Sequence, residues 1–147
     1  MATLVVGFGE EKTSDFYYYF KQLLHYDPDQ IQLLYATPHR WTPYFEEVKD
    51  QKIINLDQTQ WDYKHQILES NHLKPITILI YVKLIEVLIQ TRPKALNRLF
   101  FHKEKRLRKA MKWYSSIGKR VWFFEIYSYF KNFKNEKSKP LIDFWKY

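Results

Sequence analysis

Two stretches of the chain concentrate residue types that bind ligands or do chemistry. One reads Thr-Pro-His-Arg-Trp-Thr-Pro-Tyr-Phe over residues 37–45, and the other reads Asp-Gln-Thr-Gln-Trp-Asp-Tyr-Lys-His-Gln over 57–66. The first follows an apolar run, Ile31 to Ala36, that is typical of a buried strand. Because loops at strand ends often carry binding residues, we treat this stretch as a candidate site, with an ordinary surface turn as the alternative.

Metal and nucleophile chemistry find little support in the residue pattern. Asp62 and His65 lie one helical turn apart, but the five histidines show no recognised ligand spacing, so we predict no metal site. Ser115 and Ser116 precede Gly118 and are interpreted as the end of a helix. The chain has no Cys, which excludes disulfides, thiolate zinc sites and Cys-ligated iron–sulfur clusters within it.

The first third of the chain predicts a β-α-β unit. Leu4 to Phe8 and Ile31 to Ala36 are expected strands, and a helix should start at Thr13 or Ser14 and end before Pro28. Apolar residues recur at helical spacing on one face of that helix, namely Phe16, Tyr19, Phe20, Leu23 and Leu24. Such a unit implies parallel strands, so both strand ends should lie at one rim.

The pair Gly7-x-Gly9 at that rim lacks the third glycine of a dinucleotide fingerprint, since position 12 is Lys. We expect Gly7 to allow a close approach of the backbone to another group. A third strand is expected at Lys52 to Leu56, followed by a helix capped by Asp57.

The rest of the chain predicts helices. We expect Ile76 to Thr91, Pro93 to Phe101, Leu107 to Ile117 ended by Gly118, and Val121 to Phe133. The first carries Lys83, Glu86 and Gln90 on one stripe and is shorter than a membrane span, so we predict a buried or interfacial helix. On the last helix a core-facing stripe is predicted, made of Trp122, Phe123, Ile126, Tyr127 and Phe130. The polar tail, Lys134 to Lys139, should fray.

Charge is divided unevenly along the chain. Residues 1–75 hold 7 Lys and Arg against 11 Asp and Glu, whereas residues 76–147 hold 17 against 5. A basic band with Trp113 and Tyr114 inside it contains Lys103, Lys105, Arg106, Arg108, Lys109, Lys112, Lys119 and Arg120. Such a band suits nucleic acid, an anionic membrane or an acidic partner. We favour a solvated helix face instead, because the aromatics recur at helical spacing.

Several motifs together resemble one family. They are Val-Val-Gly-Phe-Gly-Glu-Glu at 5–11, Tyr-Asp-Pro-Asp-Gln-Ile at 26–31, the stretches 37–45 and 57–66, Arg92-Pro93-x-x-Leu96, Phe101-His102, and Gly118-x-Arg120-Val121-Trp122-Phe123-x-Glu125-Ile126. The chain resembles the C-terminal part of cobalamin-type radical S-adenosylmethionine enzymes, and more closely the anaerobic magnesium-protoporphyrin IX monomethyl ester oxidative cyclases. The family's Cys-x-x-x-Cys-x-x-Cys cluster loop does not occur in this sequence.

This resemblance implies an α+β fold: a short N-terminal β-α-β piece of a partial radical S-adenosylmethionine barrel over 1–56, then a helical C-terminal region over 57–147. The family uses S-adenosylmethionine, a 4Fe-4S cluster and cobalamin, none of which we expect this chain to bind alone. By analogy, Val5, Val6, Gly7 and Phe8 would border S-adenosylmethionine. The substrate side would hold His39, Arg40, Trp41, Trp61, Asp62 and His65.

The function implied is that of a fragment or split member of the oxygen-independent cyclase, an oxidoreductase that forms the fifth ring of (bacterio)chlorophyll. Radical chemistry is not expected from this chain alone. Its partners would be the porphyrin and a separate chain with the missing barrel and cluster loop. The alternative is a basic, aromatic helical interaction module for an anionic membrane surface, nucleic acid or a partner protein. We expect a cytoplasmic protein, with a peripheral place at a membrane left open.

Overall fold

The computed structural model describes residues 1–132 and 139–144. Strands β1 (Ala2–Val6) and β2 (Ile31–Tyr35) pair in parallel, in a register that joins Ala2 to Ile31 and Val6 to Tyr35. Helix α1 (Thr13–Tyr26) connects them. The predicted β-α-β unit and the α+β fold are thus confirmed, although β1 begins and ends two residues earlier than expected.

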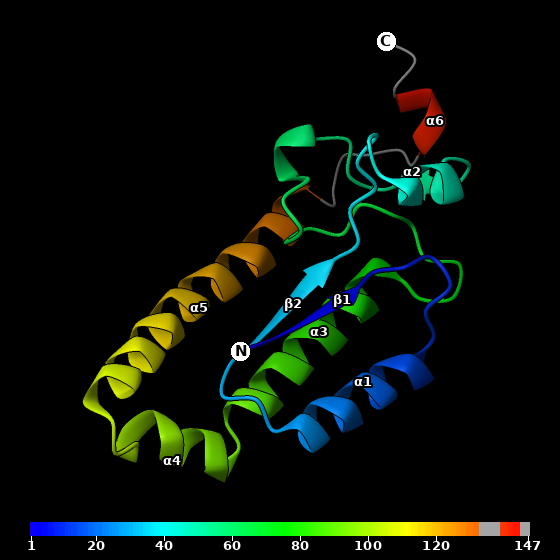
Figure 1. Ribbon diagram of the computed structural model, residues 1–147. Helices are drawn as coiled ribbons and strands as arrows, with labels where there is room; N and C mark the ends of the chain where they lie inside the picture. The colour runs from blue at the N-terminus through cyan, green and yellow to red at the C-terminus, as the bar shows by residue number, and fades with distance from the viewer. Residues whose placement is uncertain (133–138, 145–147) are drawn as a thin grey trace.

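One face of this sheet forms the main core with α1 and α3 (Pro75–Gln90) (Figure 1). Alternation along the strands turns Val6, Leu33 and Tyr35 into that core, where they meet Phe16 of α1 and Val82 of α3. Pro75 stands in the first turn of α3, where its missing N–H costs nothing. Helix α1 ends at Asp27, which adopts a left-handed conformation before Pro28.

A second, smaller core lies beyond the end of β2. Buried side chains of α2 (Pro43–Val48), β3 (Lys52–Ile53) and α6 (Leu141–Phe144) meet there with Trp61, Ile67 and Leu68. These last three follow the 3-10 helix η1 (Gln58–Gln60), and strand β4 (Lys139–Pro140) directly precedes α6. The expected third strand is therefore shorter than predicted, and it pairs antiparallel with β4 rather than with the parallel sheet. Ile53 is fully buried in this second core, and its burial fixes β3 beside β4.

Helix α4 (Pro93–Phe101) has the predicted bounds, but the last two expected helices are one. Helix α5 (Lys105–Asn132) continues through Gly118, so the prediction of a helix end there was wrong. A side chain at Gly118 would meet open space. A glycine ends a helix when it turns left-handed; within a helix it only lowers the stability by about 1 kcal/mol, which a long helix can absorb.

The predicted core stripe of α5 was wrong for three of its five members, whereas Trp122 and Ile126 are half-buried beside the inward face. Phe123, Tyr127 and Phe130 are 67%, 63% and 59% exposed, whereas Glu125 and Ser128 are buried. The inward face is set by Glu125, which pairs with a buried lysine of α3. Residues 134–138 of the expected frayed tail lie outside the described residues, and Lys139 begins β4. No helix in the described ranges has the length and apolar character needed to cross a membrane.

Candidate functional site

The turn after β1 is organised by a carboxylate that the sequence analysis did not single out. Glu11 is buried, and its Oε2 accepts hydrogen bonds from the backbone N–H of Gly7 at 2.7 Å and of Phe8 at 3.1 Å. Its Oε1 accepts one from the Tyr19 hydroxyl at 3.0 Å. Burial raises the pKa of Glu11, and these hydrogen bonds offset part of that rise. The available sequence signal was the acidic pair Glu10-Glu11 directly after Gly9.

The four residues expected to border S-adenosylmethionine differ in what they offer. Val6 is fully buried in the core, whereas the side chains of Val5 and Phe8 reach solvent. Gly7 has a φ of 83°, and a Cβ there would lie 2.9 Å from the Tyr35 ring, so the close approach expected of Gly7 is made to Tyr35. The assignment to the cofactor stays a prediction.

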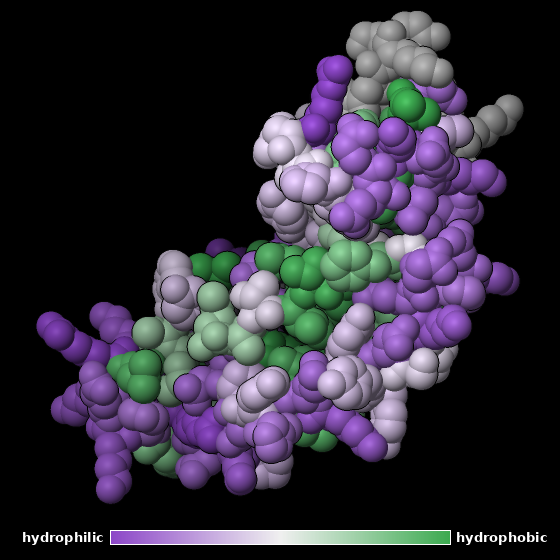
Figure 2. All heavy atoms as spheres, turned by 45° about the vertical axis from the view of Figure 1, so that its right-hand side comes forward, coloured by the Kyte–Doolittle hydropathy of each residue, from purple (hydrophilic) through white to green (hydrophobic). Residues whose placement is uncertain are grey.

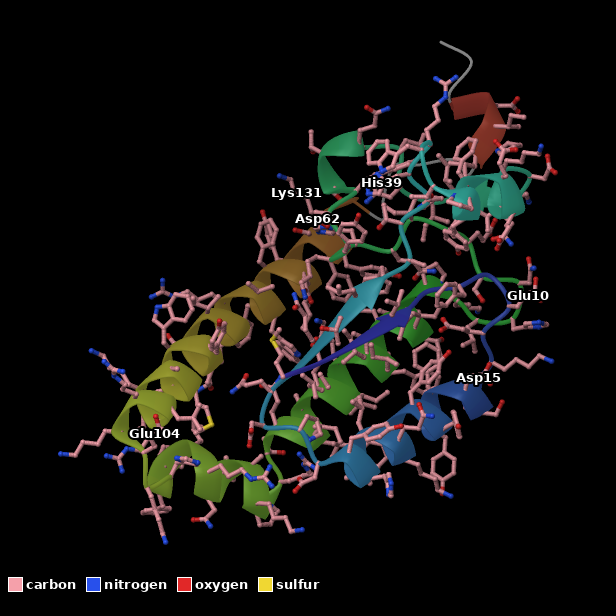
Figure 3. All side chains as sticks on the ribbon, viewed as in Figure 1. Glu10, Asp15, His39, Asp62, Glu104 and Lys131 are labelled. Carbon is pink, nitrogen blue, oxygen red and sulfur yellow. The ribbon has the colours of Figure 1, made fainter. Side chains whose placement is uncertain are left out.

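The loop after β2 presents an aromatic surface beside a cationic residue. The His39 ring stacks on Trp41 with centroids 4.6 Å apart, and it meets Tyr63 edge-on at 5.4 Å. Trp41 is 80% exposed, and Arg40 is exposed beside it. The contact between His39 and Tyr63 joins the two stretches that the sequence analysis picked out. Figure 3 shows His39 and Asp62 close to one another past the end of β2.

Trp61 plays a different part from the other predicted substrate-side residues. It is only 8% exposed, packs in the second core, and donates from Nε1 to the Asn55 carbonyl at 3.2 Å. Asp57 caps the short 3-10 helix just before it, with Oδ1 accepting from the Thr59 N–H at 3.0 Å, as the capping prediction required. Trp61 therefore anchors residues 57–66 to the second core and does not belong to their exposed surface.

Asp62 and His65 form a pair at the edge of a cavity. His65 Nδ1 lies 2.9 Å from Asp62 Oδ1, and the His65 side chain is buried with its ring edge-on to Phe124 of α5. The cavity measures about 270 Å³ and lies between β2, the 54–69 segment and the C-terminal half of α5. Polar side chains such as Tyr35, Lys64 and Glu125 line it together with apolar ones such as Ile54 and Leu79.

A buried charge cluster that sequence analysis did not predict lies behind this cavity. Lys83 of α3 pairs with Glu86 at 2.9 Å and with Glu125 of α5, and Lys64 lies 3.7 Å from Glu125. Burial raises the pKa of Glu86, and Lys83 opposes that rise. Burial, together with Glu125, also raises the pKa of the Tyr35 hydroxyl. Lys83 and Glu86 on one stripe of an apolar helix were the available sequence signal for a buried ion pair. That stripe did not indicate that Glu125 of α5 would join it.

The site thus combines an exposed aromatic and cationic loop, an oriented histidine and a cavity with both polar and apolar lining. Such a surface can contact a flat apolar ring and pair with a carboxylate at the ring's edge. Within the described residues, no three His, Asp or Glu side chains converge in a way that could hold a metal ion.

Comparison with known proteins supports the resemblance noted from the motifs. The chain is 47% identical over 146 residues to a protein of Synechocystis sp. described as anaerobic magnesium-protoporphyrin IX monomethyl ester cyclase. The match covers 99% of this chain and 29% of that relative, which is consistent with the expected correspondence to its C-terminal part. No protein-family model and no solved structure matches the chain.

Proposed function

We propose that this chain is the part of an oxygen-independent cyclase that contributes to the surroundings of the porphyrin substrate, in the formation of the fifth ring of (bacterio)chlorophyll. The observation that carries the proposal is the 47% identity, which extends over 99% of the chain. Since the chain spans less than a third of that relative's length, the remaining parts of the reaction are assigned to segments or chains outside it.

The proposed role of this chain is to bind and orient the substrate. A monomethyl ester of a porphyrin with two carboxylic acid side chains keeps one free carboxylate. We assign Arg40 to that carboxylate, and the stacked His39 and Trp41 to the macrocycle face. Asp62 and His65 are assigned to the same side, and Trp61 to their support.

The family's cofactors are not assigned to this chain. A 4Fe-4S cluster needs thiolate ligands, and the sequence has no Cys, so its residues do not fit the cluster. S-adenosylmethionine and cobalamin are proposed to be held mainly elsewhere, with Val5 and Phe8 bordering the first of these. The partner implied is a chain or segment that carries the cluster loop.

A porphyrin titration tests the substrate role. Magnesium-protoporphyrin IX monomethyl ester should quench the fluorescence of the exposed Trp41, and Trp41→Phe should remove that quenching. Arg40→Ala should weaken binding roughly tenfold or more, because a charge-assisted contact to the carboxylate is lost.

Arg120→Ala, an exposed arginine on α5, serves as the matched control and should bind as the parent does. Equal affinities for the Arg40→Ala and Arg120→Ala variants would remove Arg40 from the proposal. No binding of the porphyrin to the parent chain would contradict the substrate role itself.

We also propose a second candidate function, that of an interaction module at the periphery of a membrane or on another anionic surface. The observation that favours it is the exposure of the α5 aromatics, which the sequence interpretation had turned inward. Binding of this kind should weaken steeply as salt is added, since it depends on unpaired surface cations.

A further inference from the structure

The link between α4 and α5 forms an exposed corner at one end of the molecule (Figure 1). We define the basic elbow as residues 100–114, which cover the end of α4, the link and the first turns of α5. Phe100 and Phe101 are 51% and 76% exposed, and Trp113 is 59% exposed. In Figure 3 the label of Glu104 marks this corner, far from His39 and Asp62.

Contacts within the elbow and behind it hold the corner in place. Lys112 Nζ lies 5.6 Å from the centroid of the Phe100 ring, which joins α5 to α4. The Glu104 N–H donates to His102 Nδ1 at 3.1 Å within the link. Arg98 of α4 pairs with Asp27 and Asp29 on the far side, and this anchors α4 to the β-α-β unit. The apolar rings of the elbow are therefore presented by an ordered corner.

The charge of the elbow is almost entirely of one sign. It holds six basic residues against the single acidic residue Glu104: Lys103, Lys105, Arg106, Arg108, Lys109 and Lys112. None of these six forms an ion pair among the described residues, although Arg108 also reaches the His102 carbonyl at 3.5 Å. Figure 2 shows hydrophobic and hydrophilic side chains intermixed at this end of the molecule.

Surfaces that bind at the level of lipid headgroups combine unpaired basic side chains with exposed phenylalanine and tryptophan, as the basic elbow does. The rings enter the boundary of the acyl chains, while long basic side chains reach up to the headgroup charges. An anionic lipid surface supplies the complementary charge over the whole patch, at about 1 kcal/mol per basic residue.

Nucleic acid fits the same patch less well. Phe100 and Phe101 are tilted 59° to one another with centroids 6.4 Å apart, so a flat base cannot lie between parallel rings. The elbow contains no Asn or Gln, the side chains that pair bidentately with adenine, so base reading there would fall to the same Lys and Arg residues that contact phosphate. Leu107 adds exposed aliphatic surface, which lipid covers and a phosphate backbone does not.

We propose that the basic elbow docks this protein on membranes rich in anionic lipid, with Phe100, Phe101 and Trp113 inserted at the headgroup level. This inference rests on the second candidate function above and is independent of the porphyrin proposal. It names the surface and its partner, a bilayer with anionic headgroups.

Sedimentation with vesicles tests the charge of the elbow. The chain should bind vesicles of phosphatidylcholine that contain about one third phosphatidylglycerol, and should bind pure phosphatidylcholine far more weakly. The triple variant Lys105→Gln, Arg106→Gln, Lys109→Gln should lower partition into anionic vesicles roughly a hundredfold, about fivefold for each charge lost. The control Lys12→Gln, Lys52→Gln, Lys74→Gln removes three exposed lysines elsewhere and should bind within a few-fold of the parent.

The rings are tested in the same assay. Phe100→Ser with Phe101→Ser should lower partition about tenfold or more, because apolar area no longer enters the bilayer. Tyr17→Ser with Tyr18→Ser changes two comparably exposed rings on α1 and should leave binding unchanged. Circular dichroism of every variant establishes that the helices are intact.

Other outcomes of these assays would contradict the elbow, the lipid partner or the second candidate function. If the elbow variant and the control lysine variant lose equal amounts of vesicle binding, the basic elbow is not the binding surface. Binding would then depend on the net charge of the protein alone. Binding to a single-stranded oligonucleotide without binding to vesicles would overturn the lipid partner and keep the second candidate function. If the chain binds neither at low salt, both fail.

Discussion

At the scale of single residues, two carboxylates illustrate opposite effects of their surroundings. Glu11 is buried beneath the turn after β1, and burial raises its pKa above the usual value of 4.5. Asp27 stands at the end of α1, where the hydrogen bond from Arg98 lowers its pKa below 3.8. Folding favours the protonated form of Glu11 and the charged form of Asp27. Their contributions to the free energy of unfolding therefore change with pH in opposite directions.

We predict that Glu11→Gln changes the pH dependence of unfolding in a defined direction. A folded-state pKa above 4.5 means that the native protein binds the extra proton, so the Glu11 contribution to stability is lost as pH rises through the raised pKa. The stability of Glu11→Gln relative to the parent should therefore increase with pH above 4.5 and then level off. Urea denaturation at a series of pH values measures this difference.

Asp27→Asn provides the control of opposite sign. The Asp27 contribution to stability is present above the unfolded-state pKa and is lost as pH falls through the lowered pKa. Asp27→Asn should therefore become less stable relative to the parent as pH rises. If Glu11→Gln also lost ground with rising pH, the hydrogen bonds from Gly7, Phe8 and Tyr19 would outweigh burial, and folding would lower the pKa of Glu11 instead of raising it.

At the scale of elements, α5 provides the sharpest test. Because the helix continues through Gly118 and a Cβ there would meet nothing within 4 Å, we predict that Gly118→Ala stabilises the protein by about 0.5–1 kcal/mol. The free energy of unfolding from urea titration checks this, together with an increase in helical circular dichroism. A glycine that ended the helix in a left-handed conformation would give the reverse, a loss of stability on the same substitution.

The elements that sequence predicted well are those with local signals at their ends. Pro75 and Pro93 start α3 and α4, and Asp27-Pro28 ends α1, so the residues themselves carry the boundaries. Gly118 carries an ambiguous signal, since its meaning depends on a backbone angle. The aromatic stripe of α5 was visible as a period, but a period does not say which side faces the core. That side was decided by Glu125 meeting Lys83, 42 residues away.

The same distinction applies to the candidate site. The stretches around His39 and His65 were identified from their composition, and the rim shared by the two strand ends followed from the parallel β-α-β unit. The contact of His39 with Tyr63, and the pairing of β3 with β4, join residues far apart in the sequence. Such contacts depend on the folded chain, so local patterns could not supply them.

At the scale of the whole molecule, the parallel sheet has two unlike edges. The outer edge of β2 is covered by the chain at Tyr63 and Lys64: the Tyr35 N–H donates to the Tyr63 carbonyl at 2.8 Å, and Lys64 Nζ donates to the Leu33 carbonyl at 3.4 Å. Among the described strands, β1 pairs with β2 alone. Figure 2 shows hydrophobic side chains gathered across the middle of this face of the molecule.

This open edge predicts self-association of the isolated chain, or pairing with a chain that supplies another strand. Val5, 43% exposed on the free strand, contributes to the apolar surface without belonging to the core, so Val5→Lys should leave the fold intact and block strand addition. Light scattering over a range of concentrations should find oligomers of the parent and mainly monomers of the variant. Leu84→Lys, on the exposed apolar side of α3, is the matched control. A parent that stays monomeric, or monomers restored by Leu84→Lys and not by Val5→Lys, would show that the β1 edge is not the surface through which this molecule associates.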